Sequence, residues 1–392
     1  MRNLDVAVER RVSPVELFFD LVFVFAFTQV TTLWLDDQSW GGLGRGLLVL
    51  LVLWWVWASF AWLTNTANVE ADLVLVVMLF ATAALFVAAL AVPDAFGGHR
   101  LAFGIALFVV VSAFVALYAL VSKDEPDQLA AVRRMARAVL PGAALILAAS
   151  FVPPEIQPLL WAVAFTVGFF GPNLGGLGGW RVYPSHFAER HSLVLIIAIG
   201  ESLGAIGFGT RGTHLSPSVI VAAVLGLLVA ASFWLAYFDF ASGGLERLLA
   251  GRHGAQRIAL ARDAYTYLHF PMVLGVLLFA FAMRAALADT SAPLTIIPAV
   301  ALGCSSTIYL LAFVILRWRA TRTLGRGRLI AALVFGALTA AAVAIPGLLA
   351  VATVAGAWLG LHAYELIWWR EERARRREAS VASPRSPTSQ SP

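Results

Sequence analysis

One carboxylate lies inside an otherwise apolar stretch of this sequence. Glu201 belongs to the segment Ile199-Gly-Glu-Ser-Leu-Gly204, near the middle of an apolar run over 190–209. An ionised side chain in such surroundings is costly unless it is paired or hydrated. We therefore predict that Glu201, with the adjacent hydroxyl of Ser202, binds and releases a proton or a cation. The alternative is a Glu201 that is protonated or paired with an arginine and only bonds a neighbouring helix.

A second group of polar residues gathers at the ends of several apolar runs. Glu16 and Asp20 open the first run four residues apart, which places both on one helix face. The other members of the group are Asn65, Glu189, Arg190, His191, Tyr237, Asp239 and His269. These side chains could line a cytoplasmic vestibule that leads an ion or a small molecule to Glu201. They could equally form a salt-bridge network that locks helix ends, because both signs of charge are present.

The spacing of candidate ligands argues against metal and nucleotide chemistry. His186-Phe-Ala-Glu189-Arg-His191 matches neither HExxH nor HxxEH, and His191 points away from the helix face that His186 and Glu189 share. The single cysteine, Cys304, excludes a disulfide framework and a cysteine-based zinc or iron–sulfur site. The glycine-rich stretch 171–179 lacks the lysine and hydroxyl residue of a phosphate loop. We predict no metal, no cofactor and no catalytic residue.

These residues must be positioned by apolar runs that are long enough to cross a membrane. Of the 392 residues, 60% are hydrophobic and 13% are charged, against about 25% charged in a soluble domain. A bilayer core needs about 20 apolar residues per helix. Twelve runs are present: 15–35, 46–64, 73–92, 101–121, 138–152, 157–172, 190–209, 217–239, 264–286, 294–316, 329–345 and 347–369. The sequence predicts an all-α polytopic integral membrane protein and excludes a soluble enzyme.

The basic residues predict the orientation of these helices. With the N-terminus in the cytoplasm, 24 of the 28 lysines and arginines fall on the cytoplasmic side, and only Arg45, Arg100, Arg211 and Arg284 fall outside. Cytoplasmic loops of membrane proteins carry this excess, so we expect an even number of spans and both termini inside. The same residues could contact anionic lipid. They account for the net charge of +5 without nucleic acid as a partner.

The two halves of the chain resemble each other at an offset of 173 residues. At this offset the aligned pairs are Glu16 with Glu189, Ala58-Ser59-Phe60 with Ala231-Ser232-Phe233, and Thr28 with Glu201. We predict a cytoplasmic N-terminus over 1–14 and two parallel six-helix repeats over 15–172 and 190–369. Transporters often carry such repeats, with the binding site at the repeat interface.

Two further features are interpreted as structural. Tryptophans crowd the second and eighth runs, and we interpret them as lipid-facing or interfacial because tryptophan is enriched at membrane interfaces; they are Trp54, Trp55, Trp57, Trp62 and Trp234. Residues 370–392 form a basic, Ser/Pro-rich tail that we expect to be disordered.

Three segments resemble the signatures of a known family. Residues 11–25, Arg-Val-Ser-Pro-Val-Glu-Leu-Phe-Phe-Asp-Leu-Val-Phe-Val-Phe, are similar to the amino-terminal signature of the bacterial low temperature requirement A family. Glu189-Arg-His followed by Ile199-Gly-Glu-Ser is similar to its second signature, and Trp234-Leu-Ala-Tyr-Phe-Asp to its third. The resemblance covers residues 10–370 and implies a multi-pass protein of the inner cell membrane with a link to stress or cold adaptation. A likeness of Phe18-Phe-Asp20 to endolysosomal potassium channels is an analogy only.

Together these features lead us to expect a secondary transporter or an ion-conducting protein that uses intramembrane carboxylates. Two alternatives stay open. One is an integral membrane enzyme that acts on lipid or isoprenoid substrates through Glu16, Asp20, His191, Asp239 and His269. The other is a non-catalytic membrane sensor or scaffold whose function depends on its basic tail.

Overall fold

Every regular element in the described part of the chain is a helix. The computed structural model describes residues 11–171, 176–210, 214–239 and 241–382. The first half contains α1 (Pro14–Asp36), α2 (Trp40–Thr66), α3 (Asp72–Ala91), η1 (Val92–Asp94), α4 (Arg100–Val121), α5 (Pro126–Ala148), η2 (Ala149–Phe151), α6 (Gln157–Phe165) and η3 (Thr166–Phe170). The second half contains α8 (Pro184–Gly209), α9 (Pro217–Phe238), α10 (Ser242–Ala250), α11 (Gly254–Leu260), η4 (Ala261–Tyr267), α12 (His269–Ala288), α13 (Ile296–Thr321), α14 (Arg326–Ala342) and α15 (Gly347–Ala382).

Serine residues begin three of the long helices. Ser13, Ser39 and Ser216 are the N-cap residues of α1, α2 and α9, and each side chain accepts a hydrogen bond from a backbone N–H of the first turn. The first turn of a helix leaves its N–H groups without partners, and a serine oxygen supplies one. In α1 and α9 a proline follows the cap directly, where its missing N–H costs nothing.

Ten of the described helices are long and apolar enough to cross a membrane, which confirms a polytopic helical membrane protein. The fifth span is longer than the sequence suggested, because α5 begins at Pro126 and continues through Pro141 without a break. The sixth and eleventh predicted spans are short: α6 with η3 covers Gln157–Phe170, and α14 has 17 residues. The count of twelve spans therefore stays a prediction.

Three of the tryptophans in the middle of α2 are buried, which corrects our interpretation of them as lipid-facing. Trp54, Trp55 and Trp57 are at most 4% exposed, whereas Trp234 on α9 is 45% exposed. The reason is the central place of α2, which packs against α1, α4 and α6 of its own half and against α8 and α12 of the other half. A helix surrounded on all sides buries its aromatic residues whatever their preference for interfaces.

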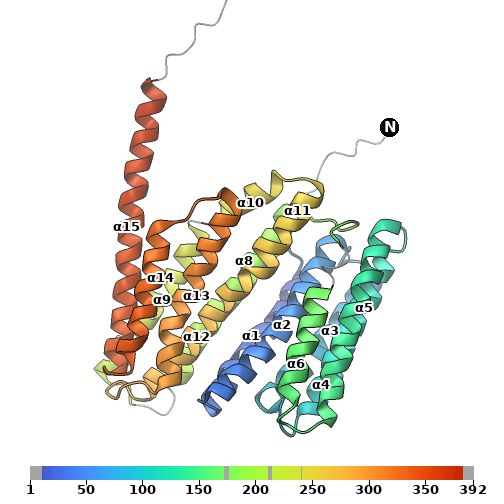
Figure 1. Ribbon diagram of the computed structural model, residues 1–392, viewed down its shortest axis with the longest axis horizontal. Helices are drawn as coiled ribbons and strands as arrows, with labels where there is room; N and C mark the ends of the chain where they lie inside the picture. Colours follow the sequence, from blue (N-terminus) through green and yellow to red (C-terminus); the bar gives the residue numbers. More distant parts are fainter. Residues whose placement is uncertain (1–10, 172–175, 211–213, 240, 383–392) are drawn as a thin grey trace, which may run out of the picture.

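The same packing order occurs in both halves of the chain. In the first half α1 packs against α2 and α3, α3 against α4, α4 against α5, α5 against α6, and α2 against α6. In the second half α8 packs against α9 and α12, α12 against α13, α13 against α14, α14 against α15, and α9 against α15. The halves lie side by side, and α1 and α8 pack against each other where the halves meet (Figure 1). This order supports the predicted repeat.

Contacts between helix ends show which of them lie at the same end of the bundle. The contact Val12–Glu189 joins the starts of α1 and α8, and Asn65–Tyr183 joins the end of α2 to the start of α8. The contact Tyr237–His269 joins the end of α9 to the start of α12, and Arg328–Ala236 joins the start of α14 to the end of α9. This is the end that the basic residues predict to be cytoplasmic. Helix α15 extends beyond it to Ala382 (Figure 1). The rest of the predicted tail, 383–392, and residues 1–10 of the N-terminus lie outside the described residues.

Candidate functional site

A buried cluster of charged side chains joins α1 and α8 where both helices begin. Nη2 of Arg190 lies 3.0 Å from Oδ1 of Asp20, and its Nε lies 3.9 Å from Oε1 of Glu16. His186, one turn before Arg190, has its Nε2 3.2 Å from Oε1 of Glu16. All four side chains are at most 1% exposed. Two carboxylates, one guanidinium and one imidazole thus meet away from solvent; we call them the inner charged cluster.

Neighbouring groups fix the positions of these four side chains. Glu16 also forms a capping box, because its Oε2 accepts a hydrogen bond of 2.9 Å from the backbone N–H of Ser13. Asp20 accepts a hydrogen bond of 3.0 Å from Nε1 of Trp57, and the guanidinium of Arg190 lies 5.8 Å from the centre of the same indole. The cluster is therefore held by α2 as well as by α1 and α8.

Several atoms of the inner charged cluster keep unused hydrogen-bonding capacity. Oε1 of Glu16, Oδ2 of Asp20 and the three nitrogens of Arg190 make no hydrogen bond of good geometry to any described residue. Most buried polar groups in proteins are hydrogen-bonded. These atoms are held by ion pairs rather than by well-aligned hydrogen bonds, so the cluster is not a closed hydrogen-bond network.

Glu201 lies on the same helix interface but past the midpoint of α8, toward the other end of the bundle. Its carboxylate accepts hydrogen bonds from the hydroxyls of Thr28, at 2.5 Å, and Thr31, at 3.0 Å, both on α1. Glu201 is 2% exposed. Arg284 of α12 interacts with it electrostatically and donates to the hydroxyl of Thr32. We call Glu201 with these partners the outer carboxylate site.

Apolar side chains separate the outer carboxylate site from the inner charged cluster. Between Asp20 and Thr28 on α1, and between Arg190 and Glu201 on α8, the buried residues include Phe23, Phe27, Val194 and Ala198, each at most 1% exposed. Along α1 and α8, the two sites are thus separated by buried apolar residues.

A third group, of imidazole and aromatic rings, adjoins the inner charged cluster. The hydroxyl of Tyr237 lies 2.9 Å from Nε2 of His269. The ring centres of His191 and His269 lie 5.2 Å apart. Trp57 joins this group to the charged residues, because its ring also meets His191 at 4.9 Å. No three His, Cys, Asp or Glu side chains of the described residues lie close enough to hold a metal ion.

The structure brings some predicted site residues together and separates others. Glu16 and Asn65 both contact His186, with Asn65 Nδ2 3.2 Å from Nδ1 of that histidine, and Arg190 joins Glu16 to Asp20. Glu189 and Asp239 are exposed at the rim, and Glu189 accepts from the backbone N–H of Val12. The hydroxyl of Ser202 donates to the carbonyl of Ile199 on its own helix.

The partners of the carboxylates were the residues that the sequence reasoning missed. His186 was considered only as a metal ligand, although it lies one helical turn from Arg190 and so shares its face. Ser13-Pro-Val-Glu16 carries the capping-box pattern that would have explained one role of Glu16. Thr28 was noted as the repeat partner of Glu201, and the structure places the two in direct contact. Nothing in the sequence pointed to Trp57 or Arg284.

These helices and their buried ionisable residues define a polytopic membrane protein with polar sites inside the bundle. Residues 11–363 match the family described as bacterial low temperature requirement A protein (LtrA). The chain belongs to this family. It is also similar to the uncharacterized protein RA0937 of Rhizobium meliloti (strain 1021), at 29% identity over 283 residues that cover 69% of this chain and 68% of that protein. No solved structure matches the chain.

Proposed function

We propose that this protein is a secondary transporter of the cytoplasmic membrane that couples movement of its cargo to a proton or cation bound by buried carboxylates. The observation that carries the proposal is the placement of acidic groups at two depths of one helix interface, Glu16 and Asp20 near one end and Glu201 toward the other. Ionisable residues inside membrane-spanning helices usually mark proton relays or substrate pathways.

The apolar layer between the two carboxylate sites favours a carrier over an open channel. Phe23, Phe27, Val194 and Ala198, which lie between the two sites along α1 and α8, are buried and apolar. In the proposed cycle a proton or cation passes this layer when α1 and α8 move relative to each other. Carriers built from repeats work by such movements of one bundle against the other, around a site at the repeat interface.

The repeat, the topology and the lipid contacts belong to the same proposal. The shared packing order of the two halves supports twelve spans arranged as two parallel six-helix repeats, with both termini in the cytoplasm. Arg247 and Arg252, exposed on and after α10, would contact anionic lipid headgroups at that side. The link to stress or cold adaptation is a proposal that rests on the description of the family.

The enzyme alternative has one observation in its favour. His191, Tyr237 and His269 gather near Asp20, which is a set of groups that could exchange protons. All of them are buried, however, and each is at most 1% exposed. A lipid substrate would have no access to them in this arrangement, so transport is the better-supported function.

Reconstitution tests the carboxylate role directly. Purified protein in liposomes should take up protons or a monovalent cation, detected by an entrapped dye, when a gradient and a membrane potential are applied. Glu201→Gln removes the charge and keeps the shape of the side chain, so uptake should fall by about tenfold or more, because general acid–base groups of this kind contribute about 100-fold or more to proton transfer. If uptake of every cation tested is the same in Glu201→Gln and wild type, the proposed role of Glu201 is wrong.

A further inference from the structure

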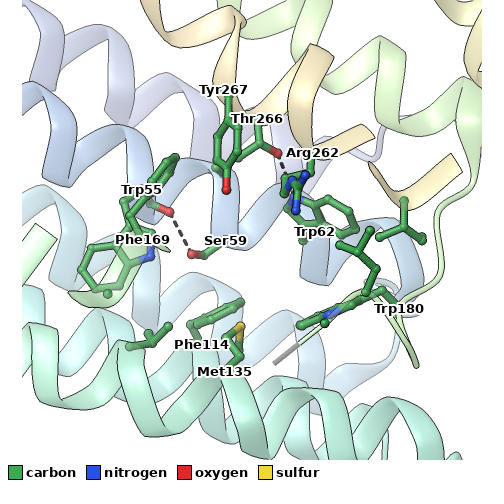
Figure 2. Close-up of a pocket in the computed structure, with 16 residues that line it drawn as sticks. Trp55, Ser59, Trp62, Phe114, Met135, Phe169, Trp180, Arg262, Thr266 and Tyr267 are labelled. Carbon is green, nitrogen blue, oxygen red and sulfur yellow. Dashed lines mark hydrogen bonds between the residues drawn. The ribbon is translucent and has the colours of Figure 1, made fainter. Parts of the chain in front are cut away.

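A cavity lies between α2, α4, α5, η3 and η4, separate from the carboxylate sites (Figure 2). Its volume is about 110 Å³, and an apolar cavity of about 150 Å³ is known to hold one benzene ring. Six aromatic side chains contribute to its wall: Trp55, Trp62, Phe114, Phe169, Trp180 and Tyr267. The first half of the chain supplies most of the wall, and η4 of the second half closes it. The enclosed volume is smaller than that of the benzene cavity, so a ring would extend to the open mouth, and the aromatic walls suit a flat ring.

The wall contributed by α2 and η4 is held in place by hydrogen bonds. Nε1 of Trp54 donates to the backbone carbonyl of Thr266 at 2.9 Å, and Nε1 of Trp62 donates to the hydroxyl of the same residue at 2.9 Å. On the other side, Gly168 allows Trp55 to approach η3, because a Cβ at Gly168 would come within 2.4 Å of that indole. The cavity is thus shaped by fixed contacts before any ligand binds.

Trp55 presents an unused hydrogen-bond donor to this cavity. Trp54, Trp57 and Trp62 on the same helix each donate a hydrogen bond from Nε1. Trp55 makes no hydrogen bond from its indole to any described residue, although it is only 4% exposed. Figure 2 shows its nitrogen on the side of the cavity where Ser59 lies. The hydroxyl of Ser59 donates to the carbonyl of Trp55, so its oxygen can still accept a hydrogen bond.

A guanidinium group lies at the mouth of the cavity. Arg262 lines the cavity and pairs with Asp263, with Nη2 2.7 Å from Oδ1. Arg319 of α13 pairs with the other oxygen of the same carboxylate at 3.1 Å. Two guanidinium groups therefore share one carboxylate at this place. Arg262 is 28% exposed, in contrast to the buried Trp55 at the deep end.

We propose that this cavity binds a small aromatic carboxylate that carries a hydroxyl on its ring. The ring lies between the indole and phenyl walls, and the carboxylate points to Arg262 at the mouth. The ring hydroxyl accepts a hydrogen bond from Nε1 of Trp55 and donates one to the oxygen of Ser59. This assignment does not depend on the proposed transport, because binding can be measured without flux.

Titration calorimetry on the full-length protein in detergent tests the proposal with three probes. They are para-hydroxybenzoate, benzoate, which lacks the hydroxyl, and para-hydroxybenzyl alcohol, which lacks the charge. Para-hydroxybenzoate should bind best. Trp55→Phe keeps a ring and removes the hydrogen-bond donor. It should therefore weaken the binding of para-hydroxybenzoate by about tenfold and leave the affinity for benzoate nearly unchanged. Arg262→Gln should weaken the binding of both carboxylates and leave the affinity for the neutral alcohol unchanged.

Matched controls separate the site from general effects on the fold. Trp358→Phe removes an indole that is buried in the second half and bonded to Ser306, and Arg247→Gln removes an exposed cation; neither should change binding. Ser59→Ala gives a second variant for the deep end if Trp55→Phe does not fold. The proposal is overturned if folded wild-type protein binds none of the probes at millimolar concentration. It is equally overturned if all three bind alike, or if the site variants bind as wild type does.

Discussion

Arg190 is the residue on which the inner charged cluster depends. Its guanidinium is fully buried and lies next to Asp20 and Glu16, with the ring of Trp57 beside it. A buried ion pair adds little net stability over an apolar pair, but removal of one partner leaves an uncompensated charge. The two carboxylates therefore rely on one cation and on His186.

Arg190→Met should destabilise the protein by about 3–5 kcal/mol, because Asp20 and Glu16 then face each other without the guanidinium. Unfolding in detergent, followed by tryptophan fluorescence, measures this loss. The matched control is Arg181→Gln, which breaks an ion pair to Glu125 that is about half exposed and should cost about 1 kcal/mol or less. Equal losses in the two variants would contradict the burial of Arg190.

The sequence predicted which ionisable residues are unusual but not how they pair. Glu201, Glu16 and Asp20 could be found because each interrupts an apolar run. Their partners Thr31, Trp57 and Arg284 come from other faces and other helices, and only the packing of α1, α2, α8 and α12 brings them together. Glu201 lies past the midpoint of α8, because this helix begins at Pro184, six residues before the predicted span.

At the scale of helices, close packing is set by glycines in specific places. A Cβ at Gly275 of α12 would lie 2.5 Å from the backbone carbonyl oxygen of Ser305 on α13, so the two helix backbones approach each other closely here. Gly200 on α8, which precedes Gly204 at the spacing of a helix-contact motif, is exposed and has nothing within 4 Å of a Cβ placed on it. The Gly-x-x-x-Gly spacing alone did not identify the contact.

Gly275→Ala should therefore cost about 1–3 kcal/mol, since the extra methyl group forces α12 and α13 apart. Gly200→Ala should be neutral or stabilise by up to about 1 kcal/mol, because alanine restricts the unfolded chain and meets no neighbour. Thermal unfolding of both variants in one detergent provides the comparison. A larger loss in Gly200→Ala than in Gly275→Ala would contradict the helix arrangement.

At the scale of the whole molecule, the hydrophobic runs predicted a polytopic helical fold correctly. They could not decide whether α6 and α14 cross the membrane, because both helices are short. They also could not show that α2 lies at the centre, which turned its tryptophans from expected lipid contacts into buried residues. Arg190, which we counted as a cytoplasmic loop charge, proved to be buried in α8.

Cysteine labelling tests the proposed topology of the molecule. In a Cys304→Ser background, Gly251→Cys between α10 and α11 should react with an impermeant maleimide only after the cells are opened. Ser291→Cys, in the exposed loop between α12 and α13, should react in intact cells. Reaction of Gly251→Cys in intact cells would show that the excess of arginines does not mark the cytoplasmic side.

The role of the buried carboxylates in transport is tested by proton flux through proteoliposomes. The proteins to compare are charge-neutralised variants at both depths of the α1–α8 interface. Asp20→Asn and Glu201→Gln should each reduce flux by about tenfold or more, because a coupled carrier needs both carboxylate sites. Glu189→Gln, exposed on the same helix, should match wild type. Wild-type flux in both Asp20→Asn and Glu201→Gln, with all three proteins folded, would contradict a carrier that works through these buried carboxylates.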